Sequence, residues 1–312
     1  MAVSDLTLCS SYANRVVAKM LALDILVEFP ECLGWLKKHV TDLHDWLIVL
    51  PLISCMAAGG SFEDGIEVAA AWYPMYLASD LLDKVDDREF TPDDVVSSPE
   101  QATNLGTSLI FLSFHRLSLI QKPGGSVRTS AIFSSQGFAA TNGQHQDLLA
   151  TSLSVNDALE KYWQTIILKS GSVFRAATAG GAAAGTTDET VINRLGDYGT
   201  AVGVMLQLLD DGRDILKTSD DVIQGWEVSL PLLLYLLATG AENIIYPPFR
   251  SSAEWHTCLR EARVIETFSV ILLQWKERAL ESIQGLAETE EKKILENFLA
   301  LVLESIKLDG TE

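Results

Sequence analysis

The sequence predicts an all-α protein, and two observations support this fold class. Apolar residues recur every three or four positions over long stretches, which is the period of a helix, and the alternation typical of strands is nearly absent. Residues that start and stop helices stand between these stretches. We predict helices over residues 62–87, 99–121, 155–184, 188–217, 227–239 and 252–306.

Turn-forming and helix-capping residues bound these stretches in chain order. The first follows Gly59 and Gly60, and the second ends before the sequence Pro-Gly-Gly at 123–125. Ser154 stands where the third helix should begin, as Thr187 does for the fourth, and both residue types cap helix N-termini well. A pair of prolines at 247–248 separates the last two stretches.

The chain shows no linker, no low-complexity segment and no solenoid repeat, so we expect one helical domain over residues 1–312. Long helices that are hydrophobic over wide faces normally line a bundle interior. Such an interior is large enough for a ligand cavity.

Composition restricts the possible partners. Of the 312 residues, 23 are Lys or Arg and 42 are Asp or Glu, which gives a formal net charge of −19. This charge argues against binding to nucleic acid or to an anionic membrane surface. A polyanionic ligand would need divalent cations or a local basic cluster.

Cysteine usage and hydropathy indicate a cytoplasmic protein. The four cysteines lie far apart without CxxC spacing, which suggests neither a zinc site nor a disulfide framework. The longest apolar run, 46–58, contains Pro51 and is too short to cross a bilayer. We therefore do not expect an integral membrane protein.

The most informative segment lies near the end of the stretch 188–217, where an apolar helix presents Asp210, Asp211 and Asp214. Asp210 and Asp214 are one turn apart, about 6 Å along the axis, so their charges repel unless a cation bridges them. Oxygen ligands on a helix suit magnesium that shares its shell with substrate phosphates.

The residues around these aspartates resemble a known family. The order Tyr198, Gly199, Gly203, Gln207, Asp210, Asp211, Asp214 is similar to the second aspartate-rich motif of the trans-isoprenyl diphosphate synthases, the polyprenyl synthetase family. Two further segments look like family motifs, Gly143-Gln144 with Asp147-Leu148 and Lys169-Ser170-Gly171. The resemblance covers roughly residues 55–235. It implies the isoprenoid synthase fold, a large helical bundle around a deep apolar cavity.

The first aspartate-rich motif of that family should lie within residues 79–88, and it departs from the pattern DDxxD. Asp83 and Asp87 keep the spacing of the outer aspartates, but Lys84 occupies the second position. A charged helix end without function is the alternative interpretation. Two more carboxylates could face the metals, Asp80 and Asp86.

The resemblance implies magnesium ions, three with bound diphosphate, that hold an allylic prenyl diphosphate of the farnesyl or geranylgeranyl class. The implied metal ligands are Asp80, Asp83, Asp86, Asp87, Asp210 and Asp214. The implied catalytic residues are Asp83, Asp87, Lys169, Asp210, Asp211 and Asp214. The implied substrate contacts are Arg88, Gln144, Lys169 and Gln207, with the small residues Ala78 and Ser79 leaving the pocket deep. We also expect a homodimer.

Departures from the family concern the second substrate, isopentenyl diphosphate. The family's GKxxR segment is absent from residues 37–51, Arg88-Glu89 replaces two arginines, and Trp226-Glu227 replaces a lysine. The sequence therefore favours prenyl transfer to an acceptor other than isopentenyl diphosphate. Three alternatives stay open: a terpene cyclase of the same fold, an ordinary chain-elongating polyprenyl diphosphate synthase, and a non-catalytic regulatory subunit.

Overall fold

The structure, a computed structural model, describes residues 3–40, 45–93, 95–149, 154–216, 228–244 and 252–304. In these ranges all regular elements are helices, apart from one isolated bridge between Ser154 and Asn243. The prediction of an all-α fold is confirmed. The helices are α1 (Val3–Leu21), η1 (Asp24–Glu28), α2 (Pro30–His39), α3 (Asp45–Ile48), α4 (Leu50–Ala57), α5 (Phe62–Asp86), α6 (Pro99–Ser118), α7 (Gly125–Leu148), α8 (Val155–Ile166), η2 (Ile167–Gly171), α9 (Ser172–Gly185), α10 (Glu189–Leu216), α11 (Leu230–Ala238), α12 (Ser252–Glu261), α13 (Val264–Ile283) and α14 (Glu290–Glu304).

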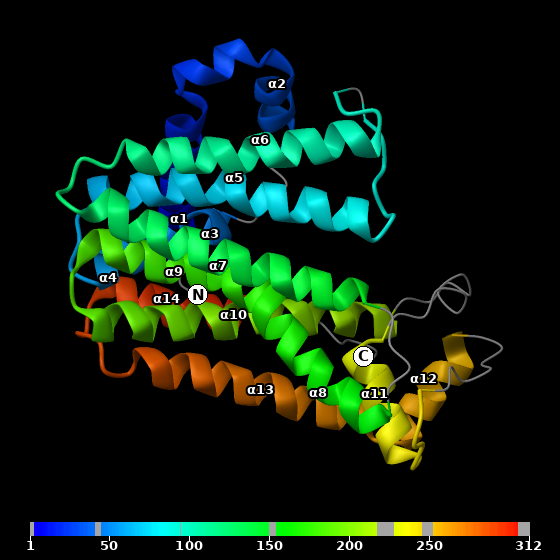
Figure 1. Ribbon diagram of the computed structural model, residues 1–312. Coiled ribbons are helices and arrows are strands. Elements are labelled where there is room, and N and C mark those ends of the chain that lie inside the picture. The colour runs from blue at the N-terminus through cyan, green and yellow to red at the C-terminus, as the bar shows by residue number, and fades with distance from the viewer. Residues whose placement is uncertain are drawn as a thin grey trace.

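The long helices lie side by side and form the body of the molecule (Figure 1). Helix α9 packs against α4, α5, α7 and α10, and α10 also contacts α13. Helices α8, α11 and α12 gather at one end (Figure 1). The C-terminal ends of α5, α7 and α10 reach this same end, so the arrangement brings both aspartate-rich segments to one side of the bundle.

The centre of the bundle is built from small residues that allow close helix packing. Helix α9 is rich in alanine and glycine, and a Cβ at Gly181 would overlap the backbone of Pro51 in α4. A Cβ at Gly60 would likewise overlap the Cys55 sulfur and the backbone of Gly185. Bulkier residues there would force α4 and α9 apart.

Both ends of α5 follow from local sequence. At its start, the Ser61 Oγ accepts a hydrogen bond from the Asp64 backbone N–H at 3.1 Å, and the Asp64 carboxylate accepts one from the Ser61 N–H, which forms a capping box. At its end, Asp87 is the C-cap and Arg88 adopts the left-handed conformation with φ 63°. The first acidic motif is therefore the last turn of this helix.

Several boundaries differ from the sequence-based prediction. Helix α7 was not predicted, because it has few apolar residues. It buries mainly Gly125, Thr129, Phe133 and Gly143. The predicted stretch 155–184 is interrupted by the π-helical turn η2, and 252–306 divides into three helices, with Arg263 in the left-handed conformation between two of them.

Among the helices of the described ranges, none is both long enough and apolar enough to span a bilayer.

Candidate active site

One face of α5 carries an ordered stripe of functional side chains. Trp72, Tyr76, Asp80, Asp83 and Asp87 are separated by three or four residues, so they follow one another along the helix. The carboxylates occupy the C-terminal turns and the aromatic rings the turns before them. The aromatic side chains therefore lie next to the carboxylates along one face of α5. We call the carboxylate end of this face the acidic rim and the aromatic part the aromatic wall.

Lys169 joins three elements at the acidic rim. Its Nζ lies 2.8 Å from Asp83 Oδ1 on α5 and 3.0 Å from Asp147 Oδ2 on α7, and its side chain is only 19% exposed. Lys169 itself belongs to η2, where the π-helical turn widens the backbone. The structure thus brings together Asp83 and Lys169, two of the residues selected from sequence, and adds Asp147.

Charge is unbalanced around this lysine. Burial raises the pKa of Asp83 in spite of the adjacent ammonium, and burial together with Asp83 raises the pKa of Asp87. Burial alone would lower the pKa of Lys169, yet Asp83 and Asp147 together raise it. One ammonium therefore does not neutralise the carboxylates, and an additional cation would stabilise them.

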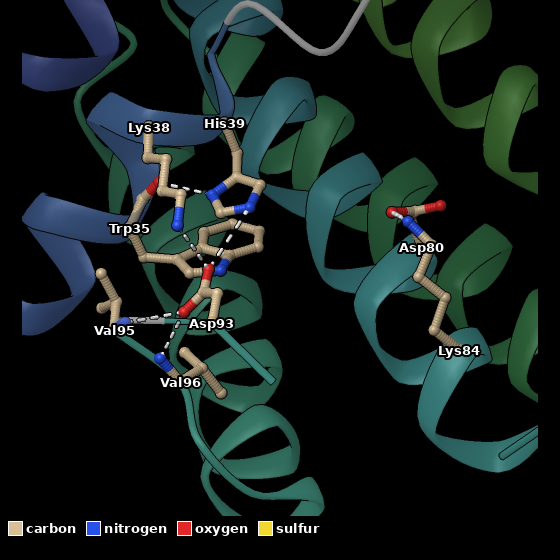
Figure 2. A network of polar contacts seen from close by, with 8 residues as sticks. All are labelled: Trp35, Lys38, His39, Asp80, Lys84, Asp93, Val95 and Val96. Carbon is tan, nitrogen blue, oxygen red and sulfur yellow. Dashed lines mark hydrogen bonds and ion pairs between the residues drawn. The ribbon is translucent and has the colours of Figure 1, made fainter. Parts of the chain in front are cut away.

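The remaining side chains of the first motif have partners of their own. Lys84 Nζ lies 2.7 Å from Asp80 Oδ2, one turn back on the same helix (Figure 2). Gln144 Nε2 lies 3.5 Å from Asp86 Oδ2, while its buried Oε1 has no hydrogen-bond partner among the described residues. An unpartnered buried acceptor beside carboxylates is a position where a cation or a substrate group would be accommodated.

Two glycines explain how the neighbouring helices approach Lys169. A Cβ at Gly143 on α7 would overlap the backbone of Lys169, and a Cβ at Gly203 on α10 would clash with the carbonyl oxygen of Ser170. Only glycine permits both approaches. The motif glycines therefore fix η2 between α7 and α10.

Asp211 is directed into the fold. Its Oδ2 accepts hydrogen bonds from the Tyr162 hydroxyl at 2.7 Å and from the Leu230 N–H at 3.1 Å, and its Oδ1 accepts one from Gln207 Nε2 at 3.3 Å. Gln207 in turn accepts a hydrogen bond from Ser170 at 2.8 Å. Burial raises the pKa of Asp211. This carboxylate connects α10 to α8 and to the first turn of α11.

The other members of the second motif lie at the C-terminal end of α10. Asp210 is exposed, and the side chain of Asp214 lies outside the described residues. Burial raises the pKa of Tyr76, and the charges of Asp80 and Asp210 add to this effect. Tyr76 therefore stands near carboxylates of both acidic helices. Arg88 is exposed beyond the end of α5.

Three aromatic rings form the wall below the acidic rim. The Tyr76 ring centroid is 5.2 Å from Trp72 and 6.0 Å from Phe174, and the Trp72 indole donates a hydrogen bond to the Val173 carbonyl at 3.0 Å. Ala78 is fully buried. The four-residue spacing of the two α5 aromatics was the sequence signal for this wall, but their contact with α9 required the structure.

The donor atoms suit magnesium, because the first motif offers carboxylate and amide oxygens and no sulfur or imidazole ligand. Within the described residues, no group of three His, Cys, Asp or Glu side chains already converges as a metal site. Magnesium bound here would therefore take part of its shell from substrate phosphates, as it commonly does. The residues present fit that ion.

The chain was compared with known proteins in sequence and in fold. Residues 94–226 match the family model described as polyprenyl synthetase. This match places the chain among proteins similar to polyprenyl synthetases over that part of its length. A geranylgeranyl pyrophosphate synthetase from the archaeon Geoglobus acetivorans has the same fold, with a TM-score of 0.80 at 18% identity, covering 97% of this chain and 100% of that one.

Two curated relatives are similar to this chain in sequence. A geranylfarnesyl diphosphate synthase from Methanosarcina mazei is 26% identical over 205 residues, which is 64% of this chain and 66% of that protein. A nonaprenyl diphosphate synthase from Mycobacterium tuberculosis is 36% identical over 108 residues, which is 32% of each protein. The chain thus matches just under two thirds of the first relative and about one third of the second.

Proposed function

We propose that the protein is a magnesium-dependent prenyltransferase that ionises an allylic prenyl diphosphate. The observation that carries this proposal is the meeting of Asp83 and Lys169 on the side of the bundle where α10 ends in its own aspartates. Carboxylates can hold cations that bind a diphosphate, and a lysine between them can bind a phosphate oxygen directly. The match of residues 94–226 to the polyprenyl synthetase model supports the same chemistry.

Asp83 and Asp87 would hold magnesium on α5, with Asp80 and Asp86 beside them, and Asp210 with Asp214 on α10. Three ions with the bound diphosphate are part of this proposal. Magnesium supplies electrophilic stabilisation of the departing pyrophosphate.

The protein's own groups hold the substrate. Lys169 would leave one of its carboxylate partners and bind a phosphate oxygen. Gln144, one turn before Asp147 on α7, would donate a hydrogen bond to the same diphosphate. The aromatic wall of Trp72, Tyr76 and Phe174 would exclude water from the prenyl chain and present π faces to an allylic cation.

The missing basic residues and the names of the relatives point to different acceptors for the prenyl group. Missing basic residues favoured an acceptor other than isopentenyl diphosphate, whereas both sequence relatives are named as synthases of prenyl diphosphates. A synthase whose product is itself a prenyl diphosphate adds isopentenyl diphosphate to its allylic substrate, so these names support chain elongation. We therefore favour a chain-elongating prenyl diphosphate synthase over transfer to another acceptor, with an allylic substrate of the farnesyl or geranylgeranyl class.

The test is incubation of the purified protein with magnesium and geranyl, farnesyl or geranylgeranyl diphosphate, with and without isopentenyl diphosphate. We expect a product longer by one five-carbon unit. Asp210→Ala should lower the rate at least about 100-fold, because it removes a carboxylate that would hold a cation. Asp197→Asn, which removes the same charge earlier on α10, is the matched control. Unchanged turnover in Asp210→Ala would contradict the proposal.

Assembly and location complete the proposal. Helices α6 and α7 contact each other and expose large apolar side chains, with Phe111 71%, Val127 74% and Phe138 81% exposed. A homodimer formed through these helices would bury these side chains, and exposed apolar patches of this kind mark interfaces. The four cysteines are free thiols, which suits a reducing cytoplasm.

A further inference from the structure

Two lysines approach the carboxylates at the C-terminal end of α5 from different elements. Lys169, from η2, lies 2.8 Å from Asp83 Oδ1. Lys84 belongs to α5 itself, and its Nζ donates a hydrogen bond to Asp80 Oδ2 at 2.7 Å (Figure 2). The Lys169 side chain is only 19% exposed, whereas those of Lys84 and Asp80 are 52% and 46% exposed. The pair formed by Lys84 and Asp80 is therefore accessible from solvent.

The geometry of the helix favours this pair. Residues four apart on a helix are neighbours, and an acidic residue that precedes a basic one is the better order of the two. In the described ranges, Asp80 is the only ion-pair partner of Lys84. Exposed pairs of this kind contribute little to stability. The main effect of Lys84 is therefore on the charge of the acidic rim.

Asp80 is close enough to act on both the acidic rim and the aromatic wall. Burial raises the pKa of Asp83, and the charges of Asp147 and Asp80 add to this effect. Burial also raises the pKa of Tyr76, and the charge of Asp80 again adds to it. Asp80 is therefore part of the site, although its carboxylate is paired with a lysine of its own helix.

A magnesium ion bound to Asp80 would lie beside an ammonium group. The ion would either take the oxygen that Lys84 holds or bind the other oxygen of the same carboxylate. In both cases its two positive charges would repel the ammonium over a short distance. Magnesium binding to Asp80 is therefore opposed by a group of the chain itself.

We infer that Lys84 is an internal cation of the first aspartate-rich motif, which holds Asp80 in an ion pair so that magnesium binds to α5 without Asp80. The inference rests on the proposed function, since it concerns the magnesium that would hold the diphosphate. It gives a role to a lysine at the position where the pattern DDxxD has its second aspartate. It also removes Asp80 from the ligands that the sequence implied.

The ion pair should lower the affinity of this motif for magnesium in two ways. It cancels one negative charge of the acidic rim, and it occupies one carboxylate oxygen. Asp80 and Asp83 are three residues apart, so their side chains are neighbours on α5 and could share an ion. Without the ammonium of Lys84, Asp80 should therefore become a metal ligand.

The experiment measures the rise in melting temperature with magnesium at a fixed concentration of inorganic pyrophosphate, and its readout is the magnesium concentration that gives half of the rise. Lys84→Met should lower this concentration at least about fivefold, because the repelling charge is removed. Asp80→Asn should raise it less than about threefold in the wild type but at least about tenfold in the Lys84→Met background, where Asp80 would be a ligand. Lys293→Met is the matched control, because Lys293 forms an exposed pair with Glu290 on α14, and it should change the readout less than about twofold.

A larger effect of Asp80→Asn in the Lys84→Met background than in the wild type would support the inference. The same effect in both backgrounds, an unchanged readout in Lys84→Met, or a wild type that magnesium and pyrophosphate do not stabilise would overturn it. Melting without magnesium shows in the same experiment that each variant is folded. The proposed function is read separately, from magnesium-dependent pyrophosphate release from farnesyl diphosphate by the wild type. If release occurs but the readout does not shift, only the inference fails.

Discussion

Adjacent aspartates in the second motif have different environments. Asp210 is exposed at the site, whereas Asp211 is 8% exposed and accepts three hydrogen bonds from α8, α10 and α11. Successive residues on a helix point about 100° apart, so one carboxylate can face the ligand while the next faces the fold. We expect Asp211 to position the end of α10 and to contribute stability.

Replacing Tyr162 tests that interpretation. Tyr162→Phe removes the 2.7 Å hydrogen bond to Asp211 and leaves a buried carboxylate oxygen with one donor fewer. We expect the free energy of unfolding to fall by about 1–3 kcal/mol, measured by urea denaturation. Tyr12→Phe is the control, because the ring packs on Phe62 and its hydroxyl has no hydrogen-bond partner in the described ranges. Equal stability of the wild type and Tyr162→Phe would refute this function of Asp211.

At this scale the sequence revealed ionic residues but not their partners. Lys169, Asp83 and Gln207 were selected from motif spacing, and the structure connects each of them to other site elements. Tyr162 was missed because it bonds to a residue 49 positions away. No local pattern encodes such a contact.

The position of η2 depends on its two neighbouring helices. Its π-helical turn holds Lys169 between α7 and α10, and both helices approach it through glycine. The sequence motifs singled out Gly143 and Gly203, but they did not show that these glycines let α7 and α10 approach η2 closely. It also failed to predict α7, because a helix whose buried face is made of small residues has little apolar periodicity to detect.

Gly143→Ala should show how closely α7 must pack on η2. The added methyl group would overlap the Lys169 backbone, so either stability falls by about 1–3 kcal/mol or Lys169 moves away from Asp83. In both cases magnesium-dependent turnover should decrease. Gly34→Ala is the matched control, since a Cβ there meets nothing within 4 Å and alanine favours the helix. A Gly143→Ala variant with wild-type stability and activity would contradict the packing argument.

For the whole molecule, periodicity and caps were sufficient to predict the fold class. The net charge argues against nucleic acid as a ligand, and this stays a prediction. Charge could not show where the few positive groups gather, because Lys38 meets Asp93 across 55 residues. The exposed apolar side chains of α6 and α7 could not be predicted from the sequence either, because exposure depends on how the other helices pack.

Assembly can be tested on that surface. Phe138→Glu or Phe111→Glu should convert a homodimer to a monomer in size-exclusion chromatography with light scattering, because a charge would be buried at the interface. Val27→Glu is the control, since Val27 is 74% exposed but belongs to η1. A monomeric wild type, or dimeric variants, would exclude an interface through α6 and α7.

Three buried cysteines, of which Cys55 lies in α4 next to the small residues Gly60 and Gly185, can report on movements of the helices. Cys9, Cys32 and Cys55 are buried, and burial raises the pKa of the Cys32 thiol to about 11 and that of Cys55 to about 12. A thiol reagent needs both access and thiolate, so these side chains should label only when helices separate. The rate at which Cys55 is modified would therefore measure how often α4 and α9 part in the native protein, and whether substrate slows that opening.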